Sequence, residues 1–195
     1  MSRKAIIRVA LLAALAGLGT ITGCSSTSQG VSADFEFTPD DSHGLMVVST
    51  RWISPTKRPG FGPHVRRNPA RNLDEKMGTV LNVHNAFIEP DFTNPPGYFY
   101  VMKFKPGTYE IISNELKENL RFEVEAGKAV YIGELEFRQV LGCLDFNAKG
   151  CVPDVYSHVV YTVRDEWERD EPLLRKRLTH YPAGGVMVRL ATPVL

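Results

Sequence analysis

Three cysteines carry the most reactive side chains of this 195-residue chain, and their positions predict two kinds of chemistry. Cys24 follows Val9–Ile21, a nearly uninterrupted apolar run of 13 residues, which itself follows three basic residues. A basic start, a short apolar run and a small residue before the cut are the parts of a secretory signal peptide. The run is shorter than the roughly 20 residues that a membrane-spanning helix needs. We therefore expect residues 1–23 to be removed.

The tetrapeptide Ile21-Thr22-Gly23-Cys24 resembles the lipobox of bacterial lipoproteins. The resemblance implies that Cys24 is lipidated and becomes the N-terminus of a 172-residue mature chain in the bacterial cell envelope. At about 0.8 kcal/mol per buried CH₂, several acyl chains anchor a protein stably. Ser25 follows the cysteine where an aspartate would, by resemblance to enterobacterial sorting, favour the inner membrane. We expect an outer-membrane anchor facing the periplasm; a secretory signal with a chance cysteine is the alternative.

Cys143 and Cys151 lie eight positions apart and are separated by a stretch rich in turn-forming residues. A secreted protein meets conditions that permit disulfides, so the pair predicts a disulfide-closed loop. Two free thiols are one alternative. A metal pair is another, although no nearby histidine or further cysteine completes a site. We expect no metal and no cofactor.

Evidence for catalysis is thin. The sequence contains no G-x-S-x-G elbow, no H-E-x-x-H and no Walker-type loop. Its five histidines are scattered singly, at His43, His64, His84, His158 and His180. The mature chain has a net charge of −2, which gives no reason to expect a nucleic-acid partner. We expect a protein that is not an enzyme.

The segment from Arg51 to Lys76 is unusually basic, with a local charge of +5 and four prolines. We interpret it as a long loop, and such loops are often functional. The hypothesis is contact with an anionic surface of lipid headgroups, lipopolysaccharide phosphates or cell-wall carboxylates, at about 1 kcal/mol per basic residue. A solvated connecting loop is the alternative. The candidate contact residues are Arg51, Lys57, Arg58, Arg66, Arg67 and Arg71.

The elements that position these residues are mainly strands. Residues 24–42, rich in Ser, Thr, Gly and Asp, predict a lipidated N-terminus and flexible tether, and residues 43–195 a single domain. Asp170 could cap a short helix whose apolar stripe is Leu173, Leu174 and Leu178. Many short strands between turn signals predict a mainly β fold, an antiparallel β-sandwich with one short C-terminal helix. The expected strands are Leu45–Trp52, Thr79–Ile88, Tyr98–Phe104, Thr108–Ser113, Asn119–Glu125, Ala129–Phe137, Val155–Arg164 and Val186–Leu190.

Two stretches, Phe104–Glu110 and Phe122–Gly133, carry a recognisable pattern of Pro-Gly-x-Tyr followed by alternating apolar residues and Gly-Lys. The pattern resembles a segment of small bacterial lipoproteins of unknown function, and of transthyretin-like and carboxypeptidase-regulatory-like β-sandwiches. It covers about 40 residues, from Tyr98 to Phe137. The resemblance implies two hairpins around an aromatic core and supplies no catalytic residues.

The function class that these observations favour is a non-enzymatic interaction module of the cell envelope, anchored to the membrane by lipid. Its exposed strand edges could receive a strand from an envelope protein. The alternative is a binding domain for a small envelope ligand, a glycan or a lipid. That ligand would lie in an aromatic cleft formed by Tyr98, Tyr100, Tyr109 and Tyr131.

Overall fold

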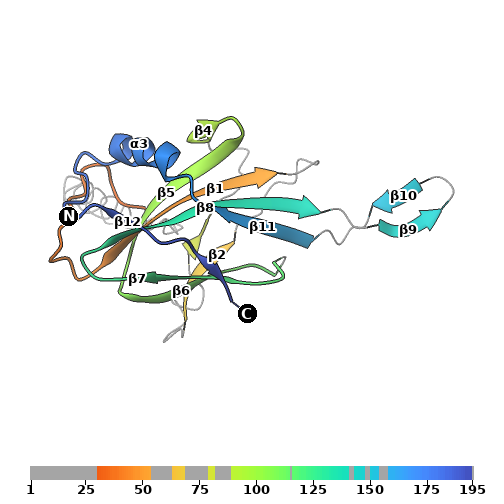
Figure 1. Ribbon diagram of the computed structural model, residues 1–195, viewed down its shortest axis with the longest axis horizontal. Coiled ribbons are helices and arrows are strands. Elements are labelled where there is room, and N and C mark those ends of the chain that lie inside the picture. The colour runs from red at the N-terminus through yellow and green to blue at the C-terminus, as the bar shows by residue number, and fades with distance from the viewer. Residues whose placement is uncertain are drawn as a thin grey trace, which may run out of the picture.

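A computed structural model describes residues 30–53, 63–68, 79–81, 89–114, 116–140, 143–147, 150–153 and 158–194. The described chain is mainly β, with two mostly antiparallel sheets, a separate two-stranded hairpin and one helix (Figure 1). This confirms the predicted mainly β class and the C-terminal helix.

The first sheet, sheet A, has the strand order β11-β8-β1-β5-β4, and β12 also pairs with β8. Two of its pairings, β1 with β8 and β12 with β8, are parallel, so the prediction of antiparallel sheets was wrong here. Consecutive strands joined by tight turns must be antiparallel, but the chain leaves β1 and returns to β8 only after building other strands, so either direction is open. The bounds are β1 (Gly44–Ile53), β4 (Phe92–Thr93), β5 (Pro96–Phe104), β8 (Ala129–Val140), β11 (His158–Arg164) and β12 (Val186–Val188).

The second sheet, sheet B, is antiparallel throughout, with the order β13-β7-β6-β2-β3. Strand β2 falls inside Arg51–Lys76, so the prediction of an uninterrupted loop was wrong for residues 64–67. The reason is Val65, which is buried while its backbone pairs with β6. The bounds are β2 (His64–Arg67), β3 (Thr79–Val80), β6 (Gly107–Ile112), β7 (Leu120–Val124) and β13 (Thr192–Pro193).

One hydrophobic cluster contains buried side chains from both sheets, among them Met46 and Phe137 of sheet A and Ile111 of sheet B. Aromatic rings form part of it: the ring centroids of Tyr109 and Phe122 lie 5.7 Å apart in a stacked arrangement. Alternating residues of β7 thus enter the core as the period-two pattern predicts.

The other face of sheet A is covered by helix α3 (Trp167–Arg177) and by the N-terminal segment 30–42. Phe37 is buried against this face, and the Val31 N–H donates to the Val101 carbonyl over 3.1 Å. Residues 30–42 were assigned to a flexible tether in the sequence, whereas the structure packs them on the sheet. The physical reason is the burial of the apolar side chains of Val31, Phe35 and Phe37. Their neighbours in the sequence are rich in Ser and Asp, so no apolar pattern is evident there.

Helix α3 begins at Trp167, three residues before the predicted cap, and its N-cap residue Glu166 makes no capping hydrogen bond through its side chain. Asp170 is fully buried inside the helix. The Trp167 ring packs 5.0 Å from the Tyr131 ring, centroid to centroid, which brings the first turn onto the sheet. The predicted stripe is confirmed in part: Leu174 and Leu178 are buried and Leu173 is partly so.

Candidate functional site

Several predicted site residues lie outside the described part of the chain: Cys24, Lys57, Arg58 and Arg71. The lipidation of Cys24 therefore stays a prediction. Among the described residues, no helix has the length and apolar character needed to cross a membrane.

Cys143 and Cys151 belong to a hairpin of β9 (Cys143–Asn147) and β10 (Gly150–Pro153) that extends beyond β8 and β11, away from both sheets (Figure 1). In its register Cys151 is opposite Phe146 and Cys143 is opposite Pro153. The side chains of this hairpin lie outside the described set, and the disulfide stays a prediction.

The three described arginines of the basic segment do not form one surface. Arg51 lies on sheet A and binds Glu134, whereas Arg66 and Arg67 lie on β2 of sheet B. Arg66 pairs with the buried Glu110 at 3.7 Å, and an Arg67 Nη donates to the Pro106 carbonyl over 2.8 Å. Contact of the whole segment with an anionic surface stays a prediction.

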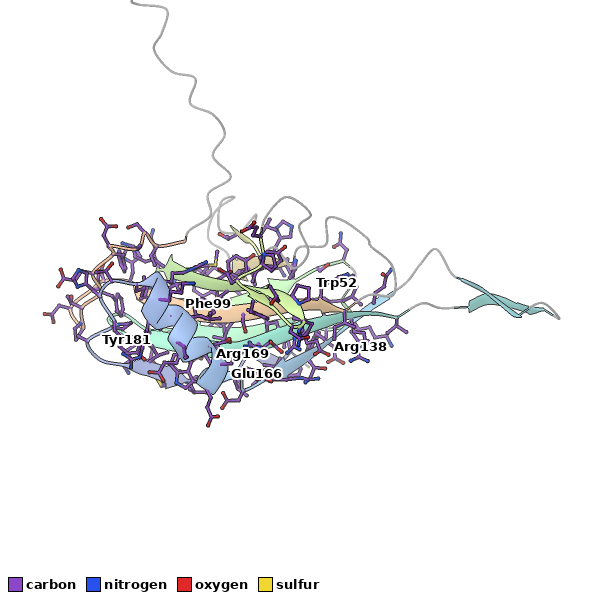
Figure 2. All side chains as sticks on the ribbon, turned by 90° about the horizontal axis from the view of Figure 1, so that it is seen from above. Trp52, Phe99, Arg138, Glu166, Arg169 and Tyr181 are labelled. Carbon is purple, nitrogen blue, oxygen red and sulfur yellow. The ribbon has the colours of Figure 1, made fainter. Side chains whose placement is uncertain are left out.

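Sheet A instead carries a row of ion pairs on the face that bears α3. Glu134 is fully buried and accepts hydrogen bonds from Arg51 and Arg169. Glu136, two residues along β8, is bound by Arg138 at 3.2 Å and Arg164 at 3.3 Å. We call this row the Arg–Glu ladder, and Figure 2 shows two of its members, Arg169 at α3 and Arg138 farther along β8. Its members are Arg51, Glu134, Glu136, Arg138, Arg164 and Arg169.

At one end the Arg–Glu ladder meets a buried hydrogen-bond cluster beneath α3. The Asp170 carboxylate accepts from Ser49 Oγ over 2.5 Å, from the Tyr131 hydroxyl over 2.7 Å and from Arg169 Nε over 2.8 Å. Burial, and then the charge of Asp170, raises the pKa of Tyr131 well above its usual value. Burial acts against the charge of Arg169, but its bonds to Glu134 and Asp170 outweigh this and raise its pKa. The cluster is a satisfied network that joins α3 to the sheet.

The predicted aromatic cleft is wrong, because Tyr109 and Tyr131 lie in two different clusters on opposite faces of sheet A. Tyr109 is buried in the cluster between the sheets, with Tyr100 packed against it. Tyr131 is buried in the cluster beneath α3, on the opposite face of sheet A. Successive residues of a strand point to opposite faces of the sheet. Tyrosines from neighbouring strands can therefore be buried on opposite faces.

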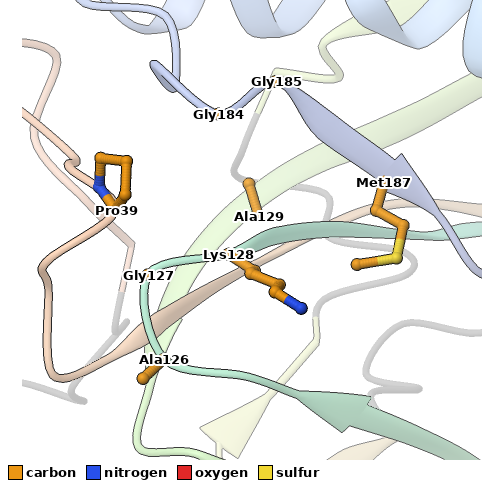
Figure 3. Close-up of a pocket in the computed structure, with 8 residues that line it drawn as sticks. All are labelled: Pro39, Ala126, Gly127, Lys128, Ala129, Gly184, Gly185 and Met187. Atoms are coloured by element: carbon orange, nitrogen blue, oxygen red, sulfur yellow. The ribbon is translucent and has the colours of Figure 1, made fainter.

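A small cavity lies where the β7–β8 turn meets the entry to β12 (Figure 3). Its volume is about 310 Å³. Lys128 is its one ionisable lining residue among the described residues, and its Nζ pairs with Glu125 at 2.5 Å. Such a cavity suits a small apolar ligand better than acid–base chemistry. The lining is Pro39, Ala126, Gly127, Lys128, Ala129, Gly184, Gly185 and Met187.

Within the described ranges no three His, Cys, Asp or Glu side chains gather as a metal site requires.

The two edges of sheet A differ. On the β5 side, β4 pairs with Pro96 and Gly97, and other groups close the rest of β5, which we call the β5 edge. Asp91 accepts the Phe99 N–H over 2.7 Å, and Arg177 donates to the Phe99 carbonyl over 2.6 Å. Arg177 also binds Asp91 at 2.6 Å. Farther along, Val31 donates to Val101. Side chains and the N-terminal segment thus take the place of a neighbouring strand, as natural sheets often arrange.

The β11 edge is open in the described part of the chain. β11 pairs with β8 on one side, from His158 to Arg164. On its other side, one bridge from Leu116 reaches Val159, and no further pairing of described residues follows toward Arg164. Val160 is an exposed apolar residue on this strand. Among the described residues, the outer side of Val160–Arg164 thus has no neighbouring strand.

The roles of Glu134, Glu136, Asp170 and Arg177 in these networks are not predicted from the sequence. The alternation Glu134-Leu135-Glu136-Phe137 was a usable signal, because it places two carboxylates on one face of a strand.

Comparisons of the chain with protein-family models, with curated proteins and with solved structures found no match.

Proposed function

We propose that this protein is a lipid-anchored, non-enzymatic interaction module of the bacterial cell envelope, and that its two sheets form a sandwich presenting β11 to a partner strand. The observation that carries the proposal is the contrast between the edges of sheet A. The β5 edge is closed by Asp91, Arg177 and Val31. The β11 edge bears a single bridge among the described residues. A protein that closes one edge with side chains and leaves the other unpaired is suited to strand addition.

The packing of residues 30–42 supports a domain held close to its membrane. If Cys24 is the lipidated residue, five residues separate it from Gly30, which bridges Met102 of β5. The six Cα–Cα steps between Cys24 and Gly30 span at most about 20 Å. The domain is then held close to its anchor, within reach of proteins of the same membrane.

Photocrosslinking in intact cells tests the proposal. A photoreactive amino acid replaces Val160, and the matched control carries it at Val188, an exposed valine of β12 (37% and 40% exposed). We expect a discrete crosslinked product from Val160 that Thr162→Glu abolishes, because a charged side chain on an edge strand opposes pairing. Equal products from both positions, or a Val160 product that Thr162→Glu leaves intact, would contradict strand addition.

The cavity of Figure 3 favours a second candidate function, binding of a small apolar envelope ligand. No atom lies within 4 Å of a Cβ placed on Gly184, so Gly184→Leu can fill the cavity without a clash at its Cβ. Native mass spectrometry of protein extracted from envelopes should then show a bound small molecule in the unmodified protein and none in Gly184→Leu. Protein that carries no small molecule in either form would exclude this candidate.

A further inference from the structure

We infer that the strand received by β11 is a segment of a partner protein in which acidic residues alternate with apolar ones. This inference rests on the proposed function and adds the chemistry of the partner. The observations that carry it are the position of the Arg–Glu ladder beside β11 and the alternation of faces along that strand.

The face that bears the ladder favours carboxylates. Val160 is opposite Arg138 and Thr162 is opposite Glu136 in the register of β11 with β8. Arg138 and Arg164 both contact Glu136, yet their side chains remain 55% and 44% exposed. A strand added to β11 would place every second side chain on this face.

In the described part of the chain, this face carries more arginines than carboxylates. Four arginines share Glu134 and Glu136, and Asp170 is the further carboxylate, which Arg169 binds beneath α3. Glu136 alone faces three of them, Arg51, Arg138 and Arg164. An acidic side chain beside Arg164 would therefore gain a cross-strand ion pair, whereas a basic one would meet like charge.

The opposite face of β11 favours apolar residues. Val159 is buried in the cluster between the sheets, and Tyr161 and Val163 pack against that cluster. An apolar side chain next to them would extend the core across the added strand. Glu118 lies near Tyr161 and, after burial, is the second cause that raises the pKa of Tyr161, so a further carboxylate on this face would meet like charge.

The open stretch sets the length of the partner segment. The bridge from Leu116 occupies the edge at Val159, and β11 ends at Arg164. Val160–Arg164 thus offers about five positions, within the usual length of a strand. Beyond Arg164, the Asp165 carboxylate accepts the Trp167 N–H at the start of α3. An acidic residue of the partner next to Asp165 would meet like charge, so the acidic pattern of the partner segment should end there.

Peptide binding tests the inference on the full mature chain, made without lipid by Cys24→Ser. The probes are two capped heptapeptides, one alternating glutamate with valine and one alternating lysine with valine. We expect the glutamate peptide to bind at least tenfold more tightly and to shift the amide NMR signals of β11. Arg164→Gln should weaken its binding about two- to fivefold, as one cross-strand ion pair implies.

A matched control is available on sheet B. Arg121 is 46% exposed and, like Arg164, binds a buried glutamate, Glu110. Arg121→Gln should leave peptide binding unchanged. Equal affinity for both peptides at β11 would overturn the acidic pattern while leaving strand addition in place. Binding of neither peptide at β11 would count against the proposed function itself. Equal competition by unstructured polyglutamate would mean that the site recognises charge alone, which also overturns the inference.

Discussion

Arg177→Met opens the closed edge of sheet A with little change in side-chain volume. It removes the hydrogen bond from Arg177 to the Phe99 carbonyl and the ion pair with Asp91, both at 2.6 Å. Asp91 would still accept the Phe99 N–H. The variant therefore isolates the carbonyl half of the closure. Lys176→Met is the matched control, because it removes a cation from the same last turn of α3.

The expected loss follows from the two contacts. A hydrogen bond from a charged donor contributes about 1.5–3 kcal/mol. The Arg177–Asp91 pair contributes about 0.2–1 kcal/mol, because both side chains are partly exposed and solvent screens them. Since Arg177 is 37% exposed, we take the lower part of the combined range, about 2 kcal/mol. For a chain of this size that loss lowers Tm by roughly 4–8 °C. Lys176→Met should cost less than about 0.5 kcal/mol.

Urea denaturation of the mature chain gives the stability difference, and sedimentation at rising protein concentration gives the association state. We expect Arg177→Met to self-associate, because the Phe99 carbonyl becomes available to another strand. Lys176→Met should remain as the unmodified protein. Equal stability losses in the two variants, with no association in either, would refute the assignment of Arg177 as the residue that closes this edge.

Three further predictions concern the buried network and the hairpin. Asp170→Asn should destabilise the fold by about 2–4 kcal/mol in urea denaturation, because Arg169 loses a buried charged partner, whereas the exposed-site control Lys176→Met should not. The pKa of Tyr131 is raised in the folded state, so its neutral hydroxyl contributes fully to stability below about pH 10, the pKa of the unfolded chain. Above that pH the contribution falls progressively. Tyr131→Phe should therefore lose less stability between pH 10 and pH 12 than the unmodified chain, by roughly 1.4 kcal/mol per pH unit; parallel pH profiles would contradict the burial of the hydroxyl. Thiol titration of the unreduced mature protein should find no free thiol at Cys143 and Cys151, and two reactive thiols would exclude the disulfide.

Strands with a clear period of two were predictable from the sequence. Leu120, Phe122 and Val124 alternate with charged residues, and β7 buries these three. The hairpin turn at Lys105–Gly107 was also predictable, because proline and glycine favour tight turns. Local signals of this kind determine β5, β6 and β7 with small errors at their ends.

Long-range pairing was not predictable from the same signals. β2 has a single buried apolar residue, Val65, among basic residues, so only its pairing with β6 identifies it as a strand. The buried position of Asp170 likewise depends on Ser49 and Tyr131, which are distant in sequence. An aspartate before a Leu-rich stretch fits a helix cap equally well, and only tertiary contacts distinguish the two roles.

The difference between the two edges of sheet A has the same origin. Arg177, at the end of α3, reaches Phe99 of β5 only because the helix crosses the sheet there. No local pattern in β5 or β11 indicates whether the strand lies at an edge of the sheet or which groups cover that edge. The candidate site is therefore a product of topology, and its residues become apparent only after the strand order is known.

Amide hydrogen exchange of the complex with the protein crosslinked through Val160 tests whether β11 receives the partner strand. Strand addition predicts slower exchange of amides between Val160 and Arg164 when the partner is bound. The Phe99 amide, already bound by Asp91, should exchange at the same rate with and without partner. Unchanged exchange along β11, or slowing confined to β5, would contradict the proposal that β11 is the edge that receives a partner.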